Sequence, residues 1–171
     1  MPFSSPQNAL KHKNDPFSKT TLHIHPESNK PDNRVYFLDH FYRNRIVKEY
    51  TNITTFADDE LNDEYTIPNQ WAGTGHVVYN RNIYYPKYNS SFIIKYSLEK
   101  RRIQKHADLP NAVFGNQAPY QWRGSTDIDL AVDENGLWAI YRERLGWYRD
   151  FCPFWAILAE NRVLNRFSQF W

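Results

Sequence analysis

The 171-residue sequence lacks the features that fix many chains in a compartment. It has one cysteine, which excludes a disulfide within the chain. It has no run of about 18 apolar residues, which a membrane-spanning helix needs. The N-terminus, MPFSSPQNALKHK, lacks the apolar segment of a signal peptide. We therefore expect no membrane span, and no export signal is visible in this chain.

An excess of charge of one sign is also missing. The 21 Lys and Arg residues almost balance the 19 Asp and Glu residues, which leaves a net charge of +2. A surface dedicated to nucleic acid or to a membrane needs a stronger bias, so nucleic acid is not an expected partner. Aromatic residues, in contrast, make up 17% of the chain. That share favours strands over helices.

Composition divides the chain into three parts. Residues 1–33 contain five prolines and few aliphatic residues, which predicts a flexible leader. Residues 34–141 alternate short aromatic and β-branched runs with polar turns, and so predict one folded region. Residues 142–171 lose this pattern. The tail is predicted to be either a docked amphipathic helix or a segment with no folded role; Ile157, Leu164, Phe167 and Trp171 would line the helical face.

The middle part predicts many short antiparallel strands. The expected strands are residues 35–38, 46–50, 76–79, 83–85, 91–96 and 127–133, with a hairpin partner at 137–141 after an Asn135-Gly136 turn. The acidic segment 57–70 is predicted to be a surface loop. Short strands with regular turns indicate an all-β fold, whether a sandwich, a barrel or a propeller.

The strongest local chemistry is a row of carboxylates at Asp127, Asp129 and Asp133. A strand period of two places them on the face opposite Ile128 and Leu130. Carboxylate oxygens are ligands for calcium, but acidic residues more often face water. A paired-carboxylate glycosidase is a distant third alternative.

Other motifs carry weaker signals. Gly73-Thr74-Gly75 lacks the Lys and the following helix of a phosphate loop, so nucleotide binding is rejected. Four arginines near tyrosines are interpreted as solvated turns rather than a nucleic-acid surface; they are Arg43, Arg45, Arg101 and Arg102. Two glycosylation sequons begin at Asn52 and Asn89, both at predicted turns.

Several ordered motifs together resemble the olfactomedin domain. They are Gly73-Thr74-Gly75-His76-Val77-Val78-Tyr79-Asn80, Ile83-Tyr84-Tyr85, Ile93-Ile94-Lys95-Tyr96, Leu109-Pro110-Asn111-Ala112, Pro119-Tyr120-Gln121-Trp122 and the stretch from Thr126 to Tyr141. The resemblance covers residues 34–141 and implies a five-bladed β-propeller, of which this chain holds an incomplete part. After Tyr141 the resemblance stops abruptly. We attribute the tail to alternative splicing, intron read-through or a gene-model error.

The resemblance also implies a function and a site. It implies an extracellular or secreted module, or the ectodomain of a membrane protein, that acts in cell adhesion or receptor signalling without catalysis. The implied partners are cell-surface or extracellular-matrix proteins. Asp129 corresponds to a calcium ligand of the family, whose other ligands come from later blades. Calcium is therefore expected in a complete domain rather than in this chain, and neither cysteine of the family's usual disulfide has a counterpart.

Two alternatives to this function stay open. The first is a non-functional partial propeller with exposed strand edges that favour aggregation. The second is a carbohydrate-active enzyme that uses the acidic face. The acidic face alone does not separate them, because sequence gives no distance between carboxylates.

Overall fold

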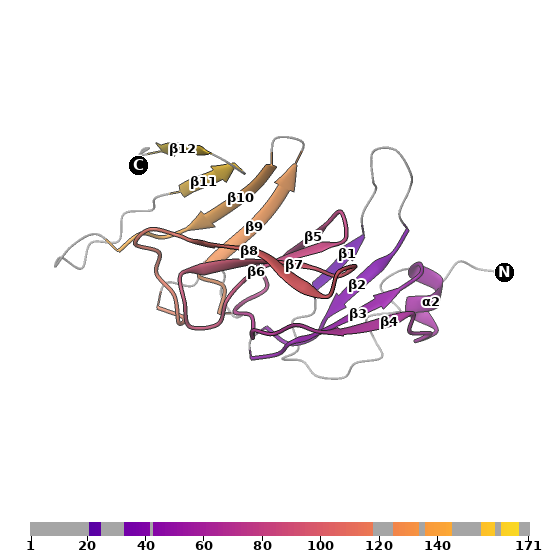
Figure 1. Ribbon diagram of the computed structural model, residues 1–171. Coiled ribbons are helices and arrows are strands. Elements are labelled where there is room, and N and C mark those ends of the chain that lie inside the picture. Colours follow the sequence, from indigo (N-terminus) through magenta and orange to yellow (C-terminus); the bar gives the residue numbers. More distant parts are fainter. Residues whose placement is uncertain are drawn as a thin grey trace.

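A computed structural model describes residues 21–24, 33–41, 43–117, 125–133, 136–144, 155–159 and 162–167. Strands dominate these residues, as Figure 1 shows. The strands are β1 (Thr21–Ile24), β2 (Val35–Leu38), β3 (Ile46–Tyr50), β4 (Asp63–Thr66), β5 (Val77–Tyr79), β6 (Asn82–Pro86), β7 (Phe92–Ser97), β8 (Arg102–Asp108), β9 (Ile128–Asp133), β10 (Gly136–Tyr141), β11 (Trp155–Ala159) and β12 (Arg162–Phe167). One short helix, α2, spans Ile53–Ala57. The expected all-β class is confirmed.

Each sheet is an antiparallel meander in chain order. The first sheet has the order β1-β2-β3-β4, and the second has the order β5-β6-β7-β8. Two hairpins follow, β9–β10 and β11–β12. Strand β11 lies beside β10, so the second hairpin continues the line of the first (Figure 1). Within each sheet of the described part of the chain, consecutive strands are therefore hydrogen-bonded neighbours.

Tight turns explain why these strands form hairpins. Asn80 and Arg81 have φ angles of 45° and 55°, and they join Tyr79 to its pairing partner Asn82. Two successive residues in the left-handed region make the turn whose twist matches the strands it connects. The sequence prediction of a turn here is confirmed.

The central strands of the second sheet, β6 and β7, are buried on both faces. Alternate residues of its strands face the first sheet and form an apolar core with it, which comprises Tyr36, Leu38, Val47, Tyr65, Ile67, Trp71, Val78, Ile83, Tyr85, Ile94, Tyr96 and Leu98. The opposite face packs against β9 and β10 through Tyr84, Ile93, Leu109, Ala112, Ile128, Leu130, Ala139 and Tyr141. Side-chain alternation along the strands thus serves two interfaces.

Helix α2 covers the outer face of the first sheet. Its Phe56 ring lies 5.6 Å from the Phe37 ring and 5.1 Å from the Tyr50 ring, centroid to centroid. Asn52 caps the helix by accepting hydrogen bonds from the backbone N–H groups of Thr54 and Thr55. In the described part of the chain, no helix has the length and apolar character needed to cross a membrane.

Three segments differ from the sequence prediction. The expected surface loop 57–70 contains β4, because Tyr65 is fully buried beneath its acidic neighbours and pairs with Val47. The expected leader 1–33 contains β1, which completes the first sheet by pairing with β2. The tail forms the hairpin β11–β12 instead of a helix, with Ile157 opposite Leu164.

Candidate functional site

The segment 73–75 and the start of β9 are held together by backbone contacts. The carbonyl oxygen of Gly75 accepts a hydrogen bond from the N–H of Leu130 at 2.9 Å. The N–H of Thr74 donates to the hydroxyl of Thr126 at 2.9 Å. These contacts hold residues 73–75, which were compared above with a phosphate loop, against the start of β9 and beside Asp129. We call residues 73–75 the ledge.

Two glycines make this close approach feasible. Gly73 has a φ of +74°, which side chains rarely tolerate. A Cβ atom at Gly75 would collide with the carbonyl oxygen of Ile128 and would lie 2.7 Å from the Cα atom of Asp129. The same Cβ would lie 2.9 Å from Oδ1 of Asp129. Glycine at position 75 therefore leaves the space that the Asp129 carboxylate uses.

Asp129 lies on β9, partly buried, with Ile140 of β10 as its cross-strand partner. Burial raises the pKa of its carboxyl group, and a hydrogen bond from the backbone of Leu130 lowers it in part. A half-buried carboxylate with a raised pKa is typical of functional sites, because the fold accepts a cost to place a charge there. A bound cation would offset that cost.

Asp127 makes a contact of its own. Asp127 is 7% exposed, and its Oδ2 accepts a hydrogen bond from the N–H of Asn116 at 2.5 Å. It therefore fastens the 115–117 loop to the start of β9. The side chain of Asp133 lies outside the described residues, as do Glu134 and Asn135 of the predicted turn.

The described residues do not supply a complete metal site. Within them, no group of three His, Cys, Asp or Glu side chains lies close enough to hold a metal ion. Calcium prefers six to eight oxygen ligands, and the described residues do not gather such a set around Asp129. Asp129 thus fits the role of one ligand in a larger set, and the set itself is not assembled by these residues.

A second polar cluster was not predicted from the sequence. Glu49 on β3 is 2% exposed, and its carboxylate accepts hydrogen bonds from the Tyr65 hydroxyl at 2.8 Å and from Asn62 Nδ2 at 2.9 Å. Arg81 Nη1 lies 3.1 Å from Glu49 Oε2, and Arg34 Nε lies 3.5 Å from Oε1. We call these five residues the Glu49 cluster.

The Glu49 cluster joins the first sheet to the turn between β5 and β6. Burial raises the pKa of the Tyr65 hydroxyl, and its hydrogen bond to Glu49 raises it further. The sequence did carry one signal. Glu49 follows Val47 by two residues, so a strand period of two places an acidic side chain on an apolar face.

The two predicted glycosylation sites differ in their surroundings. Asn52 is partly buried, and its Oδ1 accepts the two capping hydrogen bonds of α2. Asn89 is exposed, with a φ of 51°, in the turn before β7. Both lie at turns as expected, but the structure does not test whether either carries a glycan.

The chain matches the family model of the olfactomedin-like domain over residues 12–145. The match includes the ledge, Asp129 and the Glu49 cluster. It begins inside the expected leader, ahead of β1, and it ends shortly after β10.

Proposed function

Because the chain belongs to the olfactomedin-like domain family, we propose that it acts as a protein-interaction module in cell adhesion or receptor signalling. Domains of this family are generally extracellular interaction modules and are generally not enzymes. The observation that carries the proposal is the family match over residues 12–145, with three successive antiparallel sheets in the same region.

We further propose that the sheets are blades of an incomplete five-bladed propeller. The second sheet packs against the first on one face and against β9–β10 on the other, as successive propeller blades do. Extracellular or secreted localisation, whether as a free protein or as the ectodomain of a membrane protein, belongs to the same proposal. The proposal also includes partners among cell-surface or extracellular-matrix proteins. It further includes N-linked glycans at Asn52 and at Asn89.

Calcium is proposed only for a complete domain. Asp129 would supply one carboxylate ligand, and the remaining ligands would have to come from residues beyond those described. When bound, the cation would neutralise a half-buried charge and stabilise the packing of β9 against the ledge.

Two alternatives are weighed against this function. A non-functional partial propeller is not favoured by any specific contact, although its exposed strand edges would promote aggregation. A carbohydrate-active enzyme would need two carboxylates free to act on a sugar. Asp127 is committed to the backbone N–H of Asn116, so no observation favours that chemistry.

Binding to intact cells tests the proposed function. The full chain would be produced behind an added signal peptide, purified as a monomer by gel filtration, and titrated on cultured cells. We expect saturable binding that is lost when the cells are first treated with protease. Secreted monomer without saturable binding would contradict the proposal, and aggregated material would support the non-functional alternative.

A further inference from the structure

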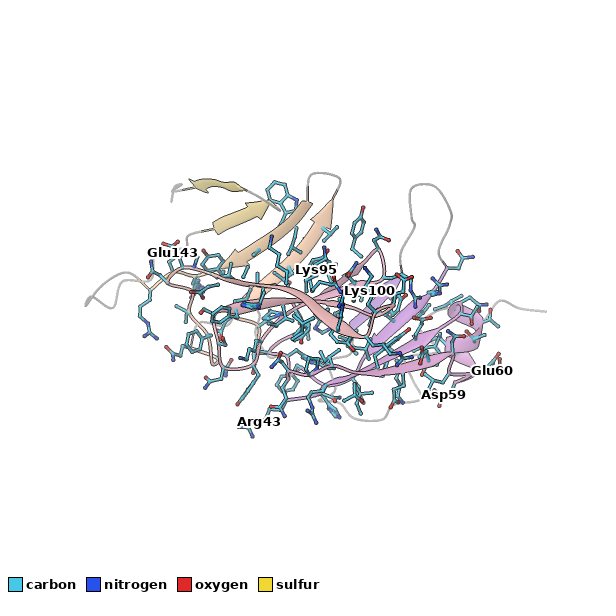
Figure 2. The ribbon with its side chains drawn as sticks, viewed as in Figure 1. Arg43, Asp59, Glu60, Lys95, Lys100 and Glu143 are labelled. Atoms are coloured by element: carbon cyan, nitrogen blue, oxygen red, sulfur yellow. The ribbon has the colours of Figure 1, made fainter. Side chains whose placement is uncertain are left out.

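The outer edge of β10 lacks the features that keep an edge strand from pairing with other molecules. In the described part of the chain, β10 forms a two-stranded sheet with β9, so its other edge carries a row of backbone groups that β9 does not use. The strand reads Gly-Leu-Trp-Ala-Ile-Tyr, without charge and without proline. Charged residues come after its end, where Figure 2 shows Glu143. Uncharged segments of this kind are typical of strands that associate edge to edge.

Strand β4, the last strand of the first sheet, has a charged edge. It begins with Asp63 and Glu64. The Arg101 guanidinium reaches across from the β7–β8 turn, with Nη2 2.7 Å from Asp63 Oδ2 and with Nη1 donating to the Glu64 carbonyl oxygen at 3.3 Å. A backbone acceptor of β4 is therefore occupied within the chain, which hinders pairing with a strand of another molecule.

Strand β8, the last strand of the second sheet, is protected in a different way. It carries charge at Arg102, Lys105 and Asp108. Its register with β7 shifts between Lys95 and Tyr96, which marks a β-bulge. Charged side chains and bulges both hinder edge-to-edge pairing. Strand β10 has neither, because it is uncharged and its register with β9 is continuous.

The hairpin β11–β12 lies where the edge of β10 needs a cover. Strand β11 lies beside β10, and β12 lies beyond β11 (Figure 1). The two strands differ in composition. Strand β11 reads Trp-Ala-Ile-Leu-Ala, without charge, whereas β12 reads Arg-Val-Leu-Asn-Arg-Phe, with two arginines. The uncharged strand is therefore next to the uncharged edge, and the charged strand is the one farther from it.

We propose that the edge of β10 is an interaction surface, that its occupant is the hairpin β11–β12 of the same chain, and that this contact keeps the protein monomeric. The hairpin replaces an uncharged edge with a strand that carries Arg162 and Arg166. A terminal repeat with a polar outer side caps a repeat array in the same way. This role of the tail does not depend on whether the chain binds cells.

A second copy of the chain is the competing occupant, because an added strand of any source satisfies the same backbone groups. The hairpin is favoured because residues 142–154 attach it covalently to β10. A short connection gives an effective concentration of about millimolar, whereas a second copy competes only at its own concentration in solution.

A proline in β11 tests the proposal in the full chain. Ile157→Pro removes a backbone N–H from the strand in which Ile157 pairs with Leu164. Ser168→Pro, just after the end of β12, is the matched control. We expect gel filtration with light scattering to show a monomer for the wild type and the control, and dimers and larger species for Ile157→Pro.

Hydrogen exchange on dilute, monomeric samples reports on the edge itself. The amides of residues 136–141 should exchange about 10- to 100-fold faster in Ile157→Pro than in the wild type, because an uncovered edge opens more readily. The amides of β6 and β7 should stay protected in both, which verifies that the second sheet is folded.

A second substitution separates the edge of β10 from other surfaces. Ile140→Lys adds the charge that β10 lacks, and it places that charge opposite Asp129 in the ladder, where opposite charges attract. We expect the double variant Ile157→Pro/Ile140→Lys to be monomeric again, because a lysine on an edge strand hinders pairing.

Three results would overturn the proposal. If Ile157→Pro stays monomeric, or if exchange at β10 is unchanged, the hairpin does not protect the edge. If the double variant self-associates as much as Ile157→Pro, the associating surface lies elsewhere. If the wild type is a dimer that Ile157→Pro converts to a monomer, the occupant of the edge is a second copy rather than the chain's own hairpin.

Discussion

The guanidinium of Arg81 lies 3.1 Å from the carboxylate of Glu49, which joins a turn of the second sheet to strand β3 of the first. Arg81 is in the turn before β6, and it also donates hydrogen bonds to the hydroxyls of Tyr36 and Tyr65. Apolar packing between sheets tolerates small slips, whereas an ion pair with fixed hydrogen bonds does not. The Glu49 cluster therefore sets how the second sheet lies against the first.

Replacing Arg81 with methionine should destabilise the protein strongly. The variant leaves a buried carboxylate without its closest cation, and loss of one partner of a buried pair costs about 3–5 kcal/mol. Arg34, at 3.5 Å, offsets part of that, so we expect about 3 kcal/mol. Urea unfolding followed by tryptophan fluorescence measures the change, with the exposed Arg102→Met as control. Equal midpoints for the two variants would contradict the role of the Glu49 cluster.

Gly75→Ala should cost more than Gly115→Ala. At position 75 a Cβ atom meets the backbone of Ile128 and Asp129, which cannot move without disturbing β9. We expect about 2–3 kcal/mol of destabilisation from this overpacking. At position 115 the φ of +76° strains alanine by about 1 kcal/mol, and the nearest atom is the side-chain Oδ1 of Asn89. Thermal melts of both variants give the comparison, and the reverse order would show that the ledge is not rigid.

Local chemistry made most hairpins predictable. The strands 35–38 and 46–50 and the turn at Asn80 follow from alternation and turn residues alone. Strand β4 was missed because it presents one apolar side chain, Tyr65, among acidic neighbours. In the tail, the spacing of Ile157 and Leu164 suits one face of a helix, but it equally suits the cross-strand pair that they form. Periodicity therefore did not discriminate between a helix and a hairpin.

The candidate site was predictable only in part. Resemblance pointed to Asp129, and the structure places it in a half-buried position. Asp127 accepts a hydrogen bond from the Asn116 backbone, a contact that depends on loop geometry and that the period of the strand does not specify. The Glu49–Arg81 pair joins residues 32 positions apart, and no local pattern specifies such a pair.

Calcium should bind this chain weakly or not at all. The described residues place no group of three His, Cys, Asp or Glu side chains around Asp129, whereas a calcium site needs six to eight oxygen ligands. Calorimetric titration of the chain with calcium, beside Asp129→Ala, measures this. A micromolar Kd that disappears in Asp129→Ala would show that other residues complete the ligand set.

Stability should fall at alkaline pH. Burial, with a hydrogen bond donated to Asp59, raises the pKa of Tyr50 to about 12, whereas an unfolded tyrosine ionises near pH 10. The native state therefore keeps a proton that the unfolded state releases, so this stabilisation is complete below about pH 10 and is lost as pH rises toward 12. We expect a loss of about 1–2 kcal/mol from this group. Urea unfolding at several pH values should show a shallower decline for Tyr50→Phe, and parallel curves would contradict the assignment.

Glycosylation at Asn52 can be separated from its structural role as a helix cap. Asn52→Asp removes the glycan acceptor but keeps a capping oxygen, so unfolding free energy should change by less than about 0.5 kcal/mol. Asn52→Ala removes both and should cost about 1 kcal/mol. At the exposed turn, Asn89→Asp likewise removes the glycan acceptor. Its effect on stability should be small, because aspartate tolerates a φ of 51°.

If both sites carry glycans, the chain secreted behind an added signal peptide should shift in mobility after treatment with an N-glycan amidase. Each Asn→Asp variant should lose one step of that shift, and the double variant should lose all of it. Thr54→Ala provides an independent check, because it breaks the sequon while Asn52 still accepts from the backbone N–H groups of residues 54 and 55. An unshifted wild-type band would contradict both sites, and an unshifted Asn89→Asp band would confine glycosylation to the exposed turn.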